Sequence, residues 1–382
     1  MLDLTHQVAG PFCTLLLADL GAEVIKIERP PQGDSARNWP SFGPSVFLAL
    51  NRNKKSLALN LTKESGKEVF QKLVKKSDIV IENMAPGVAQ KLGADFNQVK
   101  RWNKSVIYCS ISGYGKANEY SELPAWDPVI QAMSGLMSVT GEKDGAPVRI
   151  GATVVDMGAG LFGALGIVST LLARKNNRNA PAILLDISLF DSATVWMAFW
   201  VVYYSLFQKI PERSGSAWPA FSPYQVFKAR DGYVFIGASN EDYWKKLCGA
   251  LNLGFLMNNE RFSTNHQRLQ HSQELVEVIE QTTSKLPRKE IVSLLRKDQV
   301  PCSSVNNVSD LVSDATLRSR KLIESVTSKT SGPFLSVSNP LRVSKIGTTK
   351  IRPPPSIGQD SIEILKSLGY SKNQAERILS EG

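Results

Sequence analysis

Alternation of strand-like and helix-like segments over the first 190 residues limits the fold more than any other feature of the sequence. Short runs in which apolar residues alternate with charged ones, or follow one another, are typical of strands, and longer amphipathic runs are typical of helices. We expect strands at 23–27, 56–61, 78–82, 105–111, 153–155 and 183–187, and helices at 11–20, 63–76 (with Thr62 as N-cap) and 157–174. This order predicts an α/β fold in which a parallel sheet carries helices on both faces.

The length of 382 residues exceeds what one hydrophobic core usually supports, so we expect two domains. The pattern changes after residue 207, and a smaller mixed unit begins near 224. Asp231-Gly232 stands between two strand-like runs and predicts a hairpin turn. The most apolar run, 194–207, is too short to cross a bilayer, so we expect a buried helix there and no membrane span.

A formal charge of +10 favours an anionic partner, but a solvated basic surface would give the same value. Lysines and arginines are spread along the chain and no nucleic-acid-binding motif is present, so nucleic acid is disfavoured as a partner. The four cysteines form no CxxC pair, and His266 and His271 are five residues apart, which misses the helical spacing of a zinc site. We therefore expect no bound metal.

The segment Gly158-Ala159-Gly160-Leu161-Phe162-Gly163 matches the GxGxxG fingerprint of dinucleotide-binding loops. It follows an expected strand, opens an expected helix, and has Asp186 some twenty residues later. Against this reading, the Asp156 carboxylate stands directly before it and would oppose a pyrophosphate. The alternative is a helix with a glycine-rich face that packs closely on a neighbour.

Asp156 itself has three interpretations. Asp is a favoured helix N-cap, and this is the default between a strand and a helix. A surface position conflicts with the apolar flanks of Asp156. The third interpretation is a nucleophile, since a helix N-terminus stabilises the ionised carboxylate and small neighbours leave space for a substrate.

Several long motifs occur in a fixed order. They are LDLTHQVAGPFCTLLLADLGAEVIKIERP, NRNKKSLALNL, DIVIENMAPGVAQKLG, SISGYG, AMSGLMSVTG, PVRIGATVVDMGAGLFGALGI, SPYQVFKARDGYVFIG, VPCSSVNNV and RPPPSIGQ. In these motifs the chain resembles the family III CoA-transferases of the CaiB–BaiF type over nearly its whole length. Within that family it is most similar to the branch typified by succinate–hydroxymethylglutarate CoA-transferase.

The resemblance implies a Rossmann-like large domain built from both chain ends and a smaller α+β domain. The corresponding ranges are 1–190 for the first part of the large domain, 191–222 for a linker, 223–315 for the small domain, and 316–382 for the return. It also implies an interlocked homodimer and mitochondrial residence. No tightly bound cofactor is expected, because coenzyme A and acyl-CoA are substrates, together with a small carboxylic acid.

The resemblance also assigns residues. Asp156 corresponds to the family's nucleophile, and Gly215, Ser216 and Ala217 would stabilise oxyanions at the substrate, although an ordinary loop is an equal alternative. Residues expected at coenzyme A are Val8, Ala9, Arg29, Leu59, Thr62, Asn83, Met84, Lys91 and Trp126. Arg29 and Lys91 would meet phosphates, and the alternative for each is a solvated charge.

Three functions remain open. The first is transfer of coenzyme A from a donor such as succinyl-CoA to a dicarboxylic acid such as glutarate or hydroxymethylglutarate, through an aspartyl anhydride and an aspartyl-CoA thioester. The second is a nicotinamide-dependent oxidoreductase that uses the Gly158–Gly163 loop. The third is a non-catalytic relative that binds coenzyme A, suggested by Pro124 and Trp218, which depart from the family pattern. Racemisation is disfavoured, because Trp126 replaces the histidine that this branch reaction needs.

Overall fold

The computed structural model describes residues 1–175, 177, 180–342 and 351–381. The chain forms two compact units. The first comprises 1–136, 149–209 and 315–382, and the second comprises 137–148 and 210–314. Each unit has its own core, and each is described by itself.

The first unit contains a six-stranded sheet in the order β3-β2-β1-β4-β5-β6, with every neighbouring pair parallel. Its strands are β1 (Leu2–Asp3), β2 (Ile25–Glu28), β3 (Lys55–Ala58), β4 (Ile79–Glu82), β5 (Ile107–Ser112) and β6 (Ile183–Ser188). All four residues of β4 are buried, as expected for a central strand covered on both faces. The α/β fold class is therefore confirmed.

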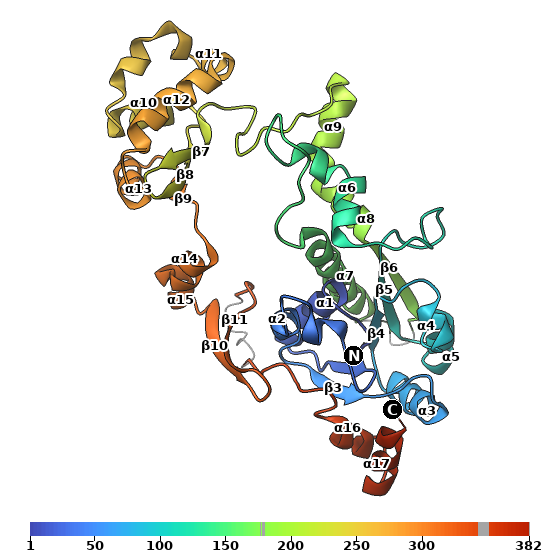
Figure 1. The fold of residues 1–382 in the computed structure, drawn as a ribbon. Coiled ribbons are helices and arrows are strands. Elements are labelled where there is room, and N and C mark those ends of the chain that lie inside the picture. Colours follow the sequence, from blue (N-terminus) through green and yellow to red (C-terminus); the bar gives the residue numbers. More distant parts are fainter. Residues whose placement is uncertain (176, 178–179, 343–350, 382) are drawn as a thin grey trace. The chain divides into compact units, whose positions relative to one another are not determined.

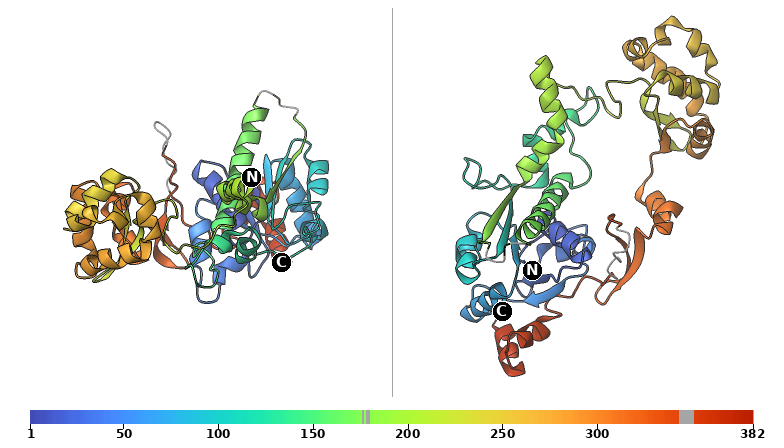
Figure 2. Two further views of the ribbon diagram at one scale, coloured as in Figure 1. Left: turned by 90° about the horizontal axis from the view of Figure 1, so that it is seen from above. Right: turned by 180° about the vertical axis from the view of Figure 1, so that it is seen from behind.

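Helices lie on both faces of this sheet (Figures 1 and 2). The helices of this unit are α1 (Ala9–Asp19), α2 (Ser45–Leu50), α3 (Glu64–Lys75), α4 (Val88–Lys91), α5 (Phe96–Trp102), α6 (Asp127–Met133), α7 (Val154–Arg174), α8 (Leu189–Trp196), α9 (Ala198–Phe207), α15 (Ala315–Ser319), α16 (Ser361–Ser367) and α17 (Lys372–Ser380). A hairpin of β10 (Ile323–Ser328) and β11 (Gly332–Val337) completes the unit.

One sheet face packs against α3, α5, α16 and α17 in a single apolar core. The carboxylate of Asp360 fixes the returning C-terminal segment, since it accepts a hydrogen bond from the Ser56 amide at 2.8 Å. On the other face α1 packs closely against α7. At Gly163, a Cβ atom would lie 3.1 Å from Cys13 Sγ and 3.4 Å from Ile111 Cδ1, so the glycine allows this close approach.

The strand order reverses between β1 and β4, because the chain winds outward from β1 toward β3 and then crosses to β4 on the other side. At such a switch point the two loops that leave the carboxyl ends of the strands diverge and open a crevice. The residues after Asp3 and after Glu82 border this crevice.

Three local expectations are wrong. Residues 153–155 form no strand, because α7 already begins at Val154. Thr62 does not cap α3, whose N-cap is Lys63. The run 194–207 is two helices rather than one, and α9 has no buried residue. The helix long and apolar enough to cross a membrane in the described part of the chain is α7, and within the first unit it lies against α1, β5 and β6.

The second unit contains an antiparallel sheet in the order β7-β8-β9. Its strands are β7 (Tyr224–Ala229), β8 (Gly232–Gly237) and β9 (Cys302–Ser304), and its helices are α10 (Glu241–Ala250), α11 (Asn265–Gln270), α12 (Ser272–Thr283), α13 (Arg288–Lys297) and α14 (Val308–Ser313). The predicted turn joins β7 to β8, and Gly232 there has a φ of 141°.

Candidate active site

A cavity of about 630 Å³ lies at the switch point of the sheet in the first unit. The loops after β1, β4 and β5 line it, together with the start of α1 and the first turn of α7. Its lining includes Leu4, His6, Gln7, Val8, Ala9, Arg29, Leu59, Asn60, Thr62, Asn83, Met84, Ser112, Ser121, Pro124, Trp126, Asp127 and Asp156. The cavity therefore gathers residues that are far apart in the sequence, from Leu4 to Leu189.

Asn83 joins the two loops that diverge at the switch point. Its side-chain oxygen accepts a hydrogen bond from the His6 amide at 2.8 Å, and its side-chain nitrogen donates to the His6 carbonyl at 2.9 Å. Both hydrogen-bonding ends of the Asn83 amide are thus engaged with the backbone after β1. The Asn83 side chain therefore holds the loop after β4 to the loop after β1 at the edge of the crevice.

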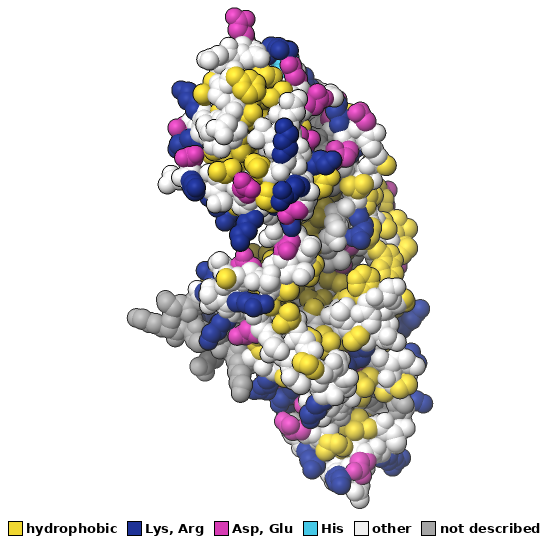
Figure 3. All heavy atoms as spheres, turned by 60° about the vertical axis from the view of Figure 1, so that its left-hand side comes forward, with side chains coloured by type: hydrophobic (Ala, Val, Ile, Leu, Met, Phe, Trp, Pro, Cys, Tyr) yellow, Lys and Arg dark blue, Asp and Glu magenta, His cyan; other side chains and the backbone are white. Residues whose placement is uncertain are grey.

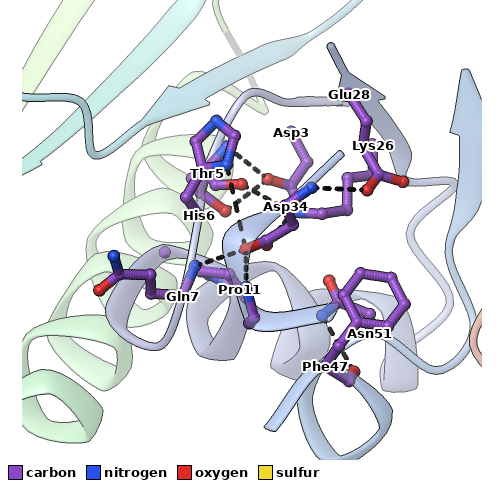
Figure 4. Close-up of polar contacts among 12 residues, drawn as sticks. Asp3, Thr5, His6, Gln7, Pro11, Lys26, Glu28, Asp34, Phe47 and Asn51 are labelled. Carbon is purple, nitrogen blue, oxygen red and sulfur yellow. Dashed lines mark hydrogen bonds and ion pairs between the residues drawn. The ribbon is translucent and has the colours of Figure 1, made fainter. Parts of the chain in front are cut away.

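A buried cluster of charged side chains supports the loop after β1 (Figure 4). Lys26 Nζ lies 2.9 Å from Asp34 Oδ2, and Lys54 Nζ lies 3.0 Å from Asp3 Oδ2. Burial alone would raise the pKa of Asp3, but Lys26 and Lys54 outweigh burial and hold it well below its usual range. Burial lowers the pKa of Lys54 to about 8. Charges placed this deep require all their partners, since an unpaired one would lack solvation.

Asp156 is the third residue of α7 and lines the cavity. Burial, followed by the neighbouring Asp127 carboxylate, raises the pKa of Asp156 to about 7. Asp127 Oδ2 accepts hydrogen bonds from the backbone amides of Val155 at 2.9 Å and Asp156 at 3.1 Å. A side chain from α6 therefore caps α7 and also places a second carboxylate beside Asp156.

This arrangement suits a carboxyl group that reacts covalently. A carboxyl group with a raised pKa is, once ionised, a stronger base and nucleophile than an ordinary aspartate. The N-terminus of α7 favours the ionised form of Asp156, so this form can be populated although the side chain is largely buried. Asp156 has no hydrogen-bond partner for its carboxylate among the described residues, so its oxygens face the cavity unengaged.

Most of the residues expected at coenzyme A come together in this cavity. Its lining contains Val8, Ala9, Arg29, Leu59, Thr62, Asn83, Met84 and Trp126. Lys91 ends α4, is exposed, and is absent from the lining. Gly215, Ser216 and Ala217 belong to the second unit, so their expected role stays a prediction.

The dinucleotide interpretation of Gly158–Gly163 is wrong. The six residues lie inside α7, beyond its first turn, and no strand precedes them. Their amides take part in the helix and cannot cradle a pyrophosphate as a loop would. A Cβ at Gly160 would lie 2.5 Å from the Ala9 carbonyl oxygen, so the glycines let α7 approach α1, as the alternative interpretation held.

Four residues of the site were missed from the sequence: His6, Gln7, Asp34 and Asp127. Asp127 could have been found, since Asp followed by Pro128 is a common helix start. Nothing in the local pattern marks Gln7 or Asp34. Among the described residues, no group of three His, Cys, Asp or Glu side chains could hold a metal ion.

Comparison with known proteins points to one family. The sequence profile of CoA-transferase family III matches residues 1–361. The succinyl-CoA:glutarate CoA-transferase of Mus musculus is 36% identical over 100% of this chain and 88% of its own length. The succinate–glutarate CoA-transferase of Agrobacterium fabrum is 30% identical over 96% of this chain and 94% of its own length. A CAIB/BAIF family protein from Brucella suis matches with a TM-score of 0.89 and 32% identity, over 96% of this chain and 97% of that one.

Proposed function

Since the chain belongs to CoA-transferase family III, we propose that it transfers coenzyme A from succinyl-CoA to a dicarboxylic acid, with Asp156 as nucleophile. Glutarate and hydroxymethylglutarate are the proposed acceptors, and the names of the mouse and Agrobacterium relatives support glutarate. The observation that carries the proposal is the Asp156 carboxyl, with a pKa of about 7, in a cavity large enough for a ligand at the sheet's switch point.

The reaction proceeds in four balanced steps. The Asp156 carboxylate attacks the thioester carbonyl of the donor, which forms a mixed anhydride and releases the thiolate of coenzyme A. That thiolate attacks the Asp156 carbonyl, which gives an aspartyl-CoA thioester and frees the donor acid. The acceptor carboxylate attacks this thioester, which forms a new anhydride and again releases the thiolate. The thiolate finally attacks the acceptor's carbonyl, which yields the new acyl-CoA and restores the Asp156 carboxylate.

Coenzyme A lies in the cavity with its nucleotide end at Arg29 and its thiol end at Asp156. The exposed Arg29 guanidinium pairs with phosphate oxygens, and Leu59 to Thr62 flank the adenine. The pantetheine arm passes Val8 and Ala9, near Asn83 and Met84. Lys91 provides a second positive charge at the nucleotide end, and Gly215–Ala217 provide amides for the oxyanions.

A second copy of the chain covers the exposed apolar surface of the first unit. The outward apolar residues include Leu161, Leu165, Val168 and Leu172 on α7 and Phe199, Val202, Leu206 and Phe207 on α9. Exposed apolar side chains also appear in yellow in the view of Figure 3. A surface of this extent is unusual on a monomer. We therefore infer a homodimer, which sedimentation will test. The mitochondrial location is proposed separately, from the resemblance to the family branch and the net charge of +10, and a fluorescent fusion will test it.

The deciding experiment uses succinyl-CoA and the intact mass of the protein. The wild type will gain the mass of a coenzyme A thioester, and peptide mapping will place it on Asp156. Asp156→Asn will gain nothing, while Asp191→Asn will behave as the wild type, since Asp191 is also the third residue of a helix but is exposed. Binding of coenzyme A with no adduct and no turnover would instead indicate a non-catalytic relative, a possibility raised by Pro124 in the cavity lining.

A further inference from the structure

Gln7 has an unusual backbone conformation. It lies in the loop between β1 and α1 with a φ of 65°, in the left-handed region that non-glycine residues seldom adopt. Such conformations persist only where the surroundings impose them, and they concentrate at ligand sites. A glutamine with this conformation therefore needs a structural or functional reason.

Buried groups on both sides impose the conformation. The Gln7 amide donates a hydrogen bond to Asp34 Oδ1 at 3.0 Å, and Lys26 holds Asp34 through the ion pair at 2.9 Å. The preceding residue, His6, is clamped by both ends of the Asn83 side chain. Because the backbone is fixed at both points, the direction of the Gln7 Cα–Cβ bond is fixed as well.

The Gln7 side chain is available to a ligand. It lines the cavity, and in Figure 4 it extends away from the charged cluster around Asp34. No hydrogen bond involves its amide group among the residues that the structure describes. Three other polar side chains of the lining are engaged, since Asn83 binds His6, Ser112 accepts from Gly115, and Thr62 donates to Asn60.

The loop that carries Gln7 adjoins the proposed nucleophile. Ala9, two residues later, lies against α7 so closely that its carbonyl oxygen is 2.5 Å from the position of a Cβ at Gly160. Gly160 is one helical turn beyond Asp156. The Gln7 loop and the Asp156 turn therefore form adjacent walls of one cavity.

We propose that Gln7 binds the carboxylic acid that accepts coenzyme A, with its side-chain Nε2–H donating to a carboxylate oxygen. This inference rests on the proposed function. A neutral amide orients the acid for attack on the aspartyl thioester without forming an ion pair that would weaken the attacking oxygen. Gln7 would thus contribute to selection of the acid rather than to binding of coenzyme A.

The test compares Gln7→Gly with Gln299→Gly. Glycine suits a positive φ at either position, so neither variant is expected to fold less well. Gln299 has a φ of 59°, is exposed and lies outside the cavity lining, which makes it a matched control. Each protein is first charged with succinyl-CoA, and discharge of the adduct is then timed against increasing glutarate.

For Gln7→Gly we expect the adduct to form at the wild-type rate and the glutarate concentration for half-maximal discharge to rise on the order of 10-fold. The melting temperature should not fall, whereas a merely structural role would lower it. Unchanged discharge in Gln7→Gly would overturn the assignment while leaving the transferase proposal intact. A wild type that forms no adduct would overturn both.

Discussion

Asp156→Asn is expected to stabilise the protein at neutral and alkaline pH while abolishing transfer. The Asp156 carboxyl has a pKa of about 7 in the folded protein, against an ordinary 3.8 for an unfolded chain. The folded state therefore binds the proton more tightly, and stability falls as pH rises from about 4 to about 7. Asn is nearly isosteric with the protonated acid and removes this loss.

The magnitude follows from the difference in pKa. A pKa difference of about three between the folded and unfolded states corresponds to roughly 4 kcal/mol in the free energy of unfolding, as an upper limit. Partial exposure of the Asp156 side chain reduces this figure. We therefore expect the free energy of unfolding of Asp156→Asn to exceed that of the wild type by roughly 2–4 kcal/mol above pH 7. A gain of about 2 kcal/mol raises the melting temperature of a unit of this size by at least about 4 °C.

The assay is a melting curve at half-unit steps from pH 4.5 to 8.5 for the wild type, Asp156→Asn and Asp191→Asn. The difference between Asp156→Asn and the wild type should widen up to about pH 7 and then stay constant. Asp191→Asn, which changes an exposed aspartate at the same helical position, is the control for the substitution itself. A wild type that melts above Asp156→Asn at pH 8 would refute the reasoning.

Three further predictions follow from the site. The kcat/KM for transfer should rise with pH through about 7 as Asp156 ionises. Asp127→Asn should lower the midpoint of this rise by less than about 1.5 pH units, since burial contributes more than Asp127 to the raised pKa of Asp156. A pH–rate profile of each protein measures both effects. Asp3→Ala should cost about 3–5 kcal/mol in denaturant unfolding, because the buried Lys54 loses its ion-pair partner and the buried Lys26 loses a neighbouring negative charge; a loss under 1 kcal/mol would contradict this. Gly160→Ala should destabilise the protein, because the new Cβ would meet the Ala9 carbonyl oxygen. Gly249→Ala, whose Cβ would meet no described atom within 4 Å apart from its chain neighbours and its own helix backbone, should stabilise it by about 0.5–1 kcal/mol, and thermal melts compare the two variants.

The sequence pattern was sufficient to predict those helices and strands whose positions depend mainly on nearby residues. The strands β2 and β4 and the helices α1 and α3 lie within two residues of their expected positions, because period and flanking residues mark them. The parallel α/β class followed from their alternation. Long ordered motifs also identified the family, and with it Asp156.

Tertiary contacts decided the elements where local preference was weak or misleading. Residues 153–155 have strand propensity, but the Asp127 carboxylate caps the amides of Val155 and Asp156 and lets α7 begin at Val154. The conformation of Gln7 depends on Asp34, which is 27 positions away and has no local signal. The apolar pattern of α9 predicted burial, but burial depends on a neighbour that the first unit does not supply.

The proposed nucleophile, Asp156, shows most clearly which properties depend on the sequence and which on the folded structure. Asp156 and Asp191 are both aspartates at the third position of an apolar helix, and the local pattern alone does not separate them. Asp191 is exposed, whereas Asp156 lies at a cavity beside a second carboxylate, and its pKa is about 7. A pKa depends on solvent and on charges within a few ångströms, and only the folded chain places those around a residue.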